Sequence, residues 1–245
     1  TLRTLLAKLY SSVKASAGNL FATATRETKY RFFQTMNYLT IIFYGTAAVG
    51  VAVCADELIT VWAGEQYVIP QPFSILIGIE LLFYGLMNNL YQIRSVGGAF
   101  RQMWFRPIMG AVINIVVSVA LVQVCGIYGV IIGTIVATIL SNFLMDPLVI
   151  HKHVFENYRP VSEYYKRNIV YIFLLSAIGA LDMFICNMFL TGHGWLSVIV
   201  HILIVAVTVP GVFIILYWKT YECQYLRGLA TSVLSKAKGK LQRRS

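Results

Sequence analysis

Four polar side chains recur at helical spacing inside one apolar stretch, "GIELLFYGLMNNLYQIR" at residues 78–94. Successive members are four, four and three positions apart, so an α-helix places them on one face: Glu80, Tyr84, Asn88 and Tyr91. An ionised carboxylate inside an apolar membrane helix costs about 2.5 kcal/mol or more, which makes such a residue a candidate for function. These groups could hydrogen-bond a polar ligand, and the carboxyl could also bind a proton.

A row of polar side chains cannot face lipid, so this face is expected to contact other helices or water. Two interpretations of Glu80 remain open, a protonated structural carboxyl and a group lining a cavity. Asp182 and His201 are isolated in later apolar stretches without polar neighbours on the same face, which favours structural roles for them. Glu80 and Asp182 are also the candidates for coupling to an ion. Asp146, close to the end of its stretch, is expected to be solvated.

The elements that carry these residues are predicted to be membrane helices. The chain has 245 residues, 58% of them hydrophobic and 12% charged, where a typical soluble domain has about 25% charged residues. The mean hydropathy is +0.71. Runs of about 20 apolar residues can cross a bilayer. Six such runs predict an all-α membrane protein, a polytopic helical bundle: residues 32–54, 73–91, 103–125, 128–150, 169–190 and 196–218.

The net charge of +10 does not indicate nucleic acid binding, because the positive charges are confined to alternate loops and to the two ends of the chain. All 20 Lys and Arg residues fall before the first run, around the second loop, in the fourth loop or in the tail. The intervening loops, 55–72, 126–129 and 191–194, contain none. This is the positive-inside pattern, and it predicts six crossings with both ends cytoplasmic. The tail "KAKGKLQRR" is interpreted either as a basic patch facing anionic lipid or as a solvated tail.

The predicted organisation has five parts. The first, residues 1–31, is interpreted either as an amphipathic helix on the membrane surface or as part of a spanning helix with Arg3 and Lys14 on one face. The chain begins without Met in a helical pattern, which leads us to expect a truncation. The remaining parts are four transmembrane helices at 32–150, a cytoplasmic loop at 151–168, two transmembrane helices at 169–218 and a basic cytoplasmic tail at 219–245.

No residue pattern predicts catalysis, a cofactor or a metal. The four cysteines are scattered without metal-ligand or disulfide spacing. The four histidines have no convergent nucleophile or acid nearby, and no phosphate-binding glycine loop occurs. A stripe of small residues in the fourth run predicts close helix packing instead: Gly129, Gly133, Ala137 and Ser141. "GIYG" at 126–129 predicts a tight hairpin between the third and fourth runs.

Three stretches together resemble the polysaccharide (Wzx-type, O-antigen or capsule) flippases of the multidrug/oligosaccharidyl-lipid/polysaccharide exporter superfamily. They are "SAGNLFATATRETKYRFFQTMNYL", "ELITVWAGEQYVIP" and the loop, span and hairpin in "SVGGAFRQMWFRPIMGAVINIVVSVALVQVCGIYGVIIGTIVATILSNF". The resemblance covers about residues 10–155. It implies the second lobe of a MATE-like fold with two additional C-terminal helices, and a first lobe that precedes this sequence.

The resemblance further implies a transporter in the bacterial cytoplasmic membrane. Such a protein would flip undecaprenyl-pyrophosphate-linked oligosaccharide by alternating access. Arg3 and Lys14 would bind the pyrophosphate, and the polar row at residues 80–91 would hydrogen-bond the sugars. Membrane lipids are expected partners, together with polysaccharide polymerase and glycosyltransferases. A multidrug/cation antiporter of the same superfamily and a non-transporting membrane assembly subunit are the alternatives.

Overall fold

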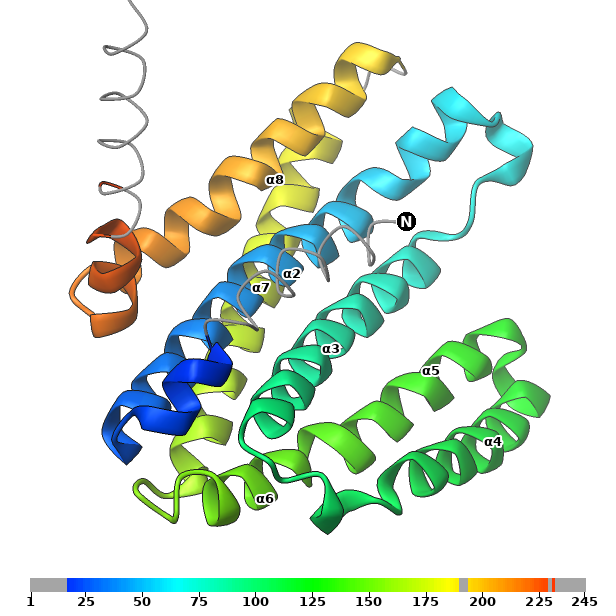
Figure 1. Ribbon diagram of the computed structural model, residues 1–245. Coiled ribbons are helices and arrows are strands. Elements are labelled where there is room, and N and C mark those ends of the chain that lie inside the picture. Colours follow the sequence, from blue (N-terminus) through cyan, green and yellow to red (C-terminus); the bar gives the residue numbers. More distant parts are fainter. Residues whose placement is uncertain (1–16, 190–193, 229–230, 232–245) are drawn as a thin grey trace, which may run out of the picture.

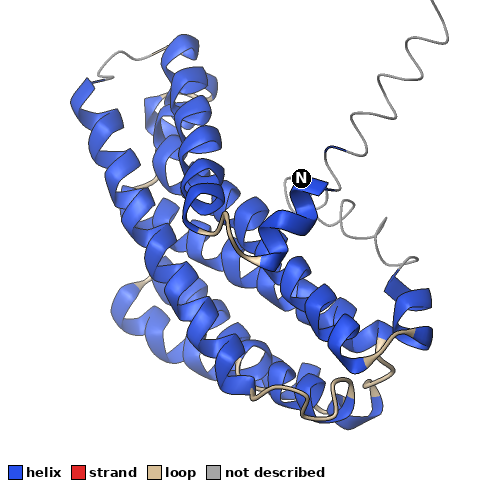
Figure 2. Ribbon diagram, turned by 90° about the vertical axis from the view of Figure 1, so that its left-hand side faces the viewer, coloured by secondary structure: helices blue, strands red, loops and turns tan. Residues whose placement is uncertain are grey.

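The computed structural model of the protein describes residues 17–189, 194–228 and 231. Within these ranges every regular element is a helix (Figures 1 and 2). The long elements are α2 (Arg26–Trp62), α3 (Gln71–Val96), α4 (Arg106–Cys125), α5 (Ile127–Thr138), α6 (Asp146–His153), α7 (Val161–Phe189) and α8 (Trp195–Leu216). The short ones are η1 (Glu65–Tyr67), η2 (Arg101–Met103) and the π-helical turn η3 (Ile139–Phe143).

The expected all-helical membrane architecture is confirmed at this level. Among the described residues, six helices are long and apolar enough to cross a membrane, with α5, η3 and α6 forming one of them. The first of the six, α2, has 37 residues, about 55 Å at 1.5 Å per residue, which exceeds the roughly 30 Å hydrocarbon core. It continues through residues 55–62, which sequence reasoning assigned to an outer loop, and stops just before Gly64 at a φ of 109°.

The helices form a core group and a peripheral hairpin (Figure 1). α2 is central, because it packs against α3, α7 and α8. α5 packs against α3, and α4 packs mainly against α5 and η3. No residue of α4 is buried, so most of this helix is available to lipid or to another protein. We call the end of the bundle with the basic loops the inner end and the opposite end the outer end.

Two glycines let α2 and α3 approach closely. A Cβ atom on Gly78 would meet the backbone carbonyl oxygen of Ala48 within van der Waals distance, and one on Gly85 would meet the ring of Tyr44. Small residues are needed where helix backbones come this near, and both glycines are buried. The close α2–α3 contact therefore fixes α3, and with it the polar row, against the core.

The hairpin between α4 and α5 is as tight as the sequence predicts. Gly126 connects the two helices alone, at a φ of 58° that favours glycine. Gly129 faces the backbone of Leu121 and Val122, and Gly133 faces Ser118. The stripe of small residues therefore serves helix packing, as expected.

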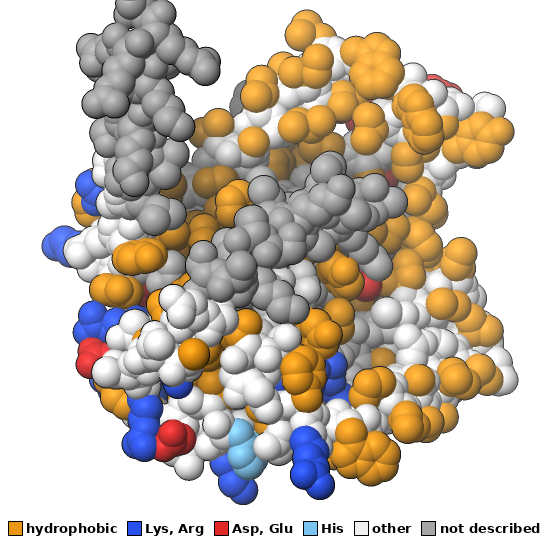
Figure 3. Space-filling model, viewed as in Figure 1, with side chains coloured by type: hydrophobic (Ala, Val, Ile, Leu, Met, Phe, Trp, Pro, Cys, Tyr) orange, Lys and Arg blue, Asp and Glu red, His pale blue; other side chains and the backbone are white. Residues whose placement is uncertain are grey.

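The inner end combines an aromatic cluster with most of the charged side chains visible in Figure 3. The cluster joins α2 to α6 and α7, and its members are Tyr30, Phe33, His151, Phe155 and Tyr164. In Figure 3 the blue and pale blue side chains gather along the lower and left-hand edges, hydrophobic side chains cover most of the upper and right-hand parts, and red side chains appear in both regions. The Lys and Arg side chains of the described residues are thus segregated to one end of the bundle, as the positive-inside pattern predicts.

Candidate functional site

The polar row of α3 lies beside the face that packs into the core. Glu80, Tyr84 and Asn88 are each half-buried, while their neighbours Leu81 and Leu82 are buried. The Tyr84 ring lies against the Tyr44 ring of α2, with centroids 6.3 Å apart. The row therefore occupies the border between α3 and its surroundings, within a helix of membrane-spanning length. Polar side chains at such a border can contact a ligand that binds beside α3.

Two amide side chains lie in or beside the inner half of this row. The Asn88 amide interacts with the Tyr44 hydroxyl of α2, and the side-chain nitrogen of Asn89 is buried without a hydrogen-bond partner. A buried unpaired donor costs about 1–3 kcal/mol, so the Asn89 donor is available to a ligand or to another polar group. Tyr91, at the end of the row, is 43% exposed and lies edge-on to Phe100 with centroids 6.1 Å apart.

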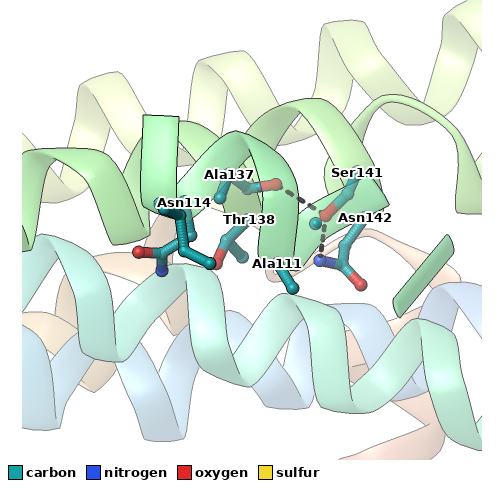
Figure 4. Close-up of a pocket in the computed structure, with 8 residues that line it drawn as sticks. Ala111, Asn114, Ala137, Thr138, Ser141 and Asn142 are labelled. Carbon is teal, nitrogen blue, oxygen red and sulfur yellow. Dashed lines mark hydrogen bonds between the residues drawn. The ribbon is translucent and has the colours of Figure 1, made fainter. Parts of the chain in front are cut away.

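A second polar surface lines a groove of about 390 Å³ between α4 and the α5–η3 segment (Figure 4). Asn114 and Thr138 lie toward one end of this groove, and Ser141 and Asn142 lie toward the other. Asn142 donates a hydrogen bond to Ser141 at 2.8 Å, and Ser141 donates to the Ala137 carbonyl at 2.6 Å. The floor of the groove is therefore polar, and Asn142 and Ser141 already form hydrogen bonds within it. Small residues keep the groove open.

The π-helical turn η3 sets the direction in which the polar side chains of this surface point. The amide nitrogen of Leu144 bonds the carbonyl of Ile139 at 2.9 Å, a spacing of five residues instead of the usual four. Such a turn inserts one extra residue, and π-turns occur frequently at functional sites. Here the turn offsets Asn142 and the following Asp146 from the line that Thr134 and Thr138 would otherwise continue. Thr134, Thr138, Asn142 and Asp146 are four positions apart in the sequence, and the π-turn makes them point in two directions instead of one.

The expectation that Asp146 is solvated is wrong. Asp146 is fully buried and accepts hydrogen bonds from Arg94 of α3 at 2.9 Å and from Arg106 of α4 at 3.0 Å. Both arginines, counted as loop charges in the sequence, are buried or nearly so, with side chains 4% and 11% exposed. This Arg–Asp–Arg triad has a net charge of +1, and the Nε atoms of both arginines are buried without a partner. It joins the inner ends of α3, α4 and α6.

Asp182 and His201, which were expected to be structural because their own helix faces offer no polar neighbours, have polar partners on other helices. Asp182 of α7 accepts a hydrogen bond from Thr208 of α8 at 2.6 Å, and His201 of α8 pairs with the carboxylate of Glu57 in α2. Sequence reasoning placed Glu57 in the outer loop. The partners lie on other helices, which spacing within a single helix cannot show.

The candidate residues of the N-terminal segment, Arg3 and Lys14, lie outside the described residues, so their predicted contact with pyrophosphate stays a prediction. Among the residues that the structure describes, no group of three or more His, Cys, Asp or Glu side chains could hold a metal ion. The described site is therefore a set of hydrogen-bonding and ionisable groups inside apolar helices. No protein-family model, curated protein or solved structure matches this chain.

Proposed function

We propose that this chain is the second lobe of a MATE-like transporter that flips an undecaprenyl-pyrophosphate-linked oligosaccharide across the cytoplasmic membrane. The observation that carries the proposal is the row of Glu80, Tyr84 and Asn88 along a half-buried face of α3. The resemblance of the three stretches in residues 10–155 to polysaccharide flippases supports the same function. In this proposal α7 and α8 are the two additional C-terminal helices.

The chemistry of the row suits a sugar headgroup. Sugar hydroxyls both donate and accept hydrogen bonds, and a carboxyl, a phenol and an amide offer both kinds of partner. The lipid tail would stay in the bilayer beside the headgroup, while Arg3 and Lys14 would neutralise the pyrophosphate. Alternating access between two lobes would then expose the headgroup to each side in turn.

The proposed orientation makes one native cysteine an outer marker. Of the four cysteines, Cys125 at the outer end of α4 is exposed, whereas the other three are buried. We expect a membrane-impermeant maleimide to label Cys125 on intact cells, and Cys125→Ser to abolish the signal. Labelling that requires inside-out vesicles would reverse the orientation and contradict cytoplasmic ends.

Transport is tested by complementation of a bacterial strain that lacks its own polysaccharide flippase, using the full-length gene. We expect Glu80→Leu to reduce surface polysaccharide at least tenfold, since the change removes the hydrogen-bonding carboxyl group from the row. The matched control is Ile79→Leu, at an exposed apolar position on the same helix turn. Protein levels in the membrane must be equal for both variants.

The same assay separates the alternatives. Restored drug efflux with unchanged polysaccharide would favour a multidrug/cation antiporter, for which the buried Asp182–Thr208 pair is the supporting observation. Restored polysaccharide with a fully active Glu80→Leu variant would favour a membrane assembly subunit that does not transport. Either outcome would refute the assignment of the α3 row to a sugar headgroup.

A further inference from the structure

Ionisable side chains from three helices lie inside the group formed by α2, α7 and α8. They are Glu57 of α2, Asp182 of α7 and His201 of α8, and all three belong to helices of membrane-spanning length. Asp182 is 0% and His201 6% exposed, and the Glu57 side chain is 12% exposed. Glu57 and His201 lie one to two turns from the outer ends of their helices. The cluster is therefore buried but close to the outer side.

The contacts within the cluster leave hydrogen-bonding capacity unused. His201 contacts the Glu57 carboxylate through Nδ1, and Thr208 donates to Asp182 Oδ2 at 2.6 Å. The other oxygen of each carboxyl and the Nε2 atom of His201 are buried without a hydrogen-bond partner. Each such atom costs about 1–3 kcal/mol when it stays unpaired. A cluster with a purely structural role would be expected to satisfy these atoms.

The charges in the cluster do not balance without protons. Cys54 and Cys186 each lie within electrostatic range of both carboxyls, and they are the other titratable groups that α2 and α7 contribute. Asp56 of α2 bonds Ser74 of α3 instead. The sequence has no Lys or Arg between Arg31 and Arg94 or between Arg167 and Lys219, so α2 beyond Arg31, the outer part of α7 and all of α8 contain none. A protonated His201 can neutralise Glu57, but then no cation is left for Asp182.

We propose that Glu57, Asp182 and His201 form a proton-binding site inside the α2–α7–α8 group. One proton is shared by the Glu57 carboxyl and the His201 imidazole, and a second resides on the unpaired oxygen of Asp182. When Asp182 releases its proton, the carboxylate keeps the hydrogen bond from Thr208 and the net charge of the site falls by one. Glu57, the most exposed member, provides contact with the outer aqueous phase. The site is independent of which substrate the protein carries.

Infrared difference spectroscopy of the full chain in lipid nanodiscs tests this directly, because protonated carboxyl groups have their own C=O band. We expect the wild type to keep a carboxylic-acid band at neutral pH and Asp182→Asn to lose the larger part of it. Glu65→Gln, which changes an exposed acid in the outer loop, is the matched control and should leave the band unchanged. A folded Asp182→Asn protein with the wild-type band would overturn the proposal.

Thr208→Val provides a second variant should Asp182→Asn fail to fold. Its hydroxyl donates to the carboxyl oxygen and so stabilises the charged form. Without it, the band is expected to persist to a higher pH than in the wild type. A band that disappears at the same pH in both proteins would contradict a proton on Asp182.

The shared proton is tested by nuclear magnetic resonance of ¹⁵N-labelled histidine in the same nanodiscs, with the His201 signal assigned through His201→Gln. Removing the carboxylate in Glu57→Gln is expected to shift the ring-nitrogen signals of His201 at neutral pH, because Nδ1 loses its carboxylate partner. The signals of the exposed His153, at the inner end, should be the same in both proteins. Unchanged His201 signals would exclude the shared proton.

Discussion

Asp146→Ala is expected to destabilise the protein by about 3–5 kcal/mol, the usual cost of removing one partner from a buried ion pair. The substitution leaves the buried Arg94 and the nearly buried Arg106 at the inner end with a combined charge of +2 and no counter-charge in contact. The measurement is thermal or denaturant unfolding in detergent, together with the yield of monodisperse protein. Glu65→Gln, an exposed acid at the outer end, is the control and should change little.

The net charge of the triad predicts an order among its variants. Arg106→Met leaves one cation and one anion, Arg94 with Asp146, so it is expected to be much milder than Asp146→Ala. Replacing all three residues with apolar ones, as Arg94→Met, Arg106→Met and Asp146→Leu, should recover much of the lost stability, because apolar replacement of buried ion pairs is often neutral or stabilising. An Asp146→Ala protein as stable as the Arg106→Met protein would show that stability does not depend on the charge balance within the triad.

The burial and pairing of this triad could not be predicted from the sequence. Each member is a charge near the end of an apolar run, and on its own it is indistinguishable from the cytoplasmic charges of the positive-inside pattern. Arg94 and Arg106 are 52 and 40 positions away from Asp146 in the sequence, and the π-turn η3 changes the direction in which Asp146 points. Hydropathy contains no information on that direction. The charge distribution was predictable, but its burial was not.

The cluster of Glu57, Asp182 and His201 could not be predicted from the sequence for a related reason. The first apolar run was ended at Cys54 because acidic residues follow it, yet α2 needs no break before Gly64. Glu57 therefore lies on a helix face that meets α8, where His201 supplies its partner. Helix number, the Gly126 hairpin and the packing role of Gly129 and Gly133 were predictable, because they depend on apolar length and side-chain size along one segment. Contacts between segments were not.

Gly78→Ala is expected to destabilise the protein by about 1–3 kcal/mol, even though alanine favours a helix by about 1 kcal/mol over glycine. The reason is that the new methyl group would occupy the space of the Ala48 carbonyl oxygen, a backbone atom that can yield only if α2 and α3 separate. Gly50→Ala is the matched control in α2, because its methyl group would meet only Val205 at 4.0 Å. That variant should be neutral or more stable in the same unfolding measurement.

Gly85 extends this test, because its obstacle is a side chain. A methyl group there would overlap the Tyr44 ring, so Gly85→Ala should also be destabilising in the wild-type background. In a Tyr44→Ala background the obstacle is gone, and adding Gly85→Ala should cost nothing further, which gives a coupling energy of about 1–3 kcal/mol in a double-mutant cycle. No side-chain truncation should rescue Gly78→Ala in this way. Additive effects at Gly85 and Tyr44 would mean that α3 does not approach α2 as closely as described, and that the polar row of Glu80 and Asn88 is held at a different place.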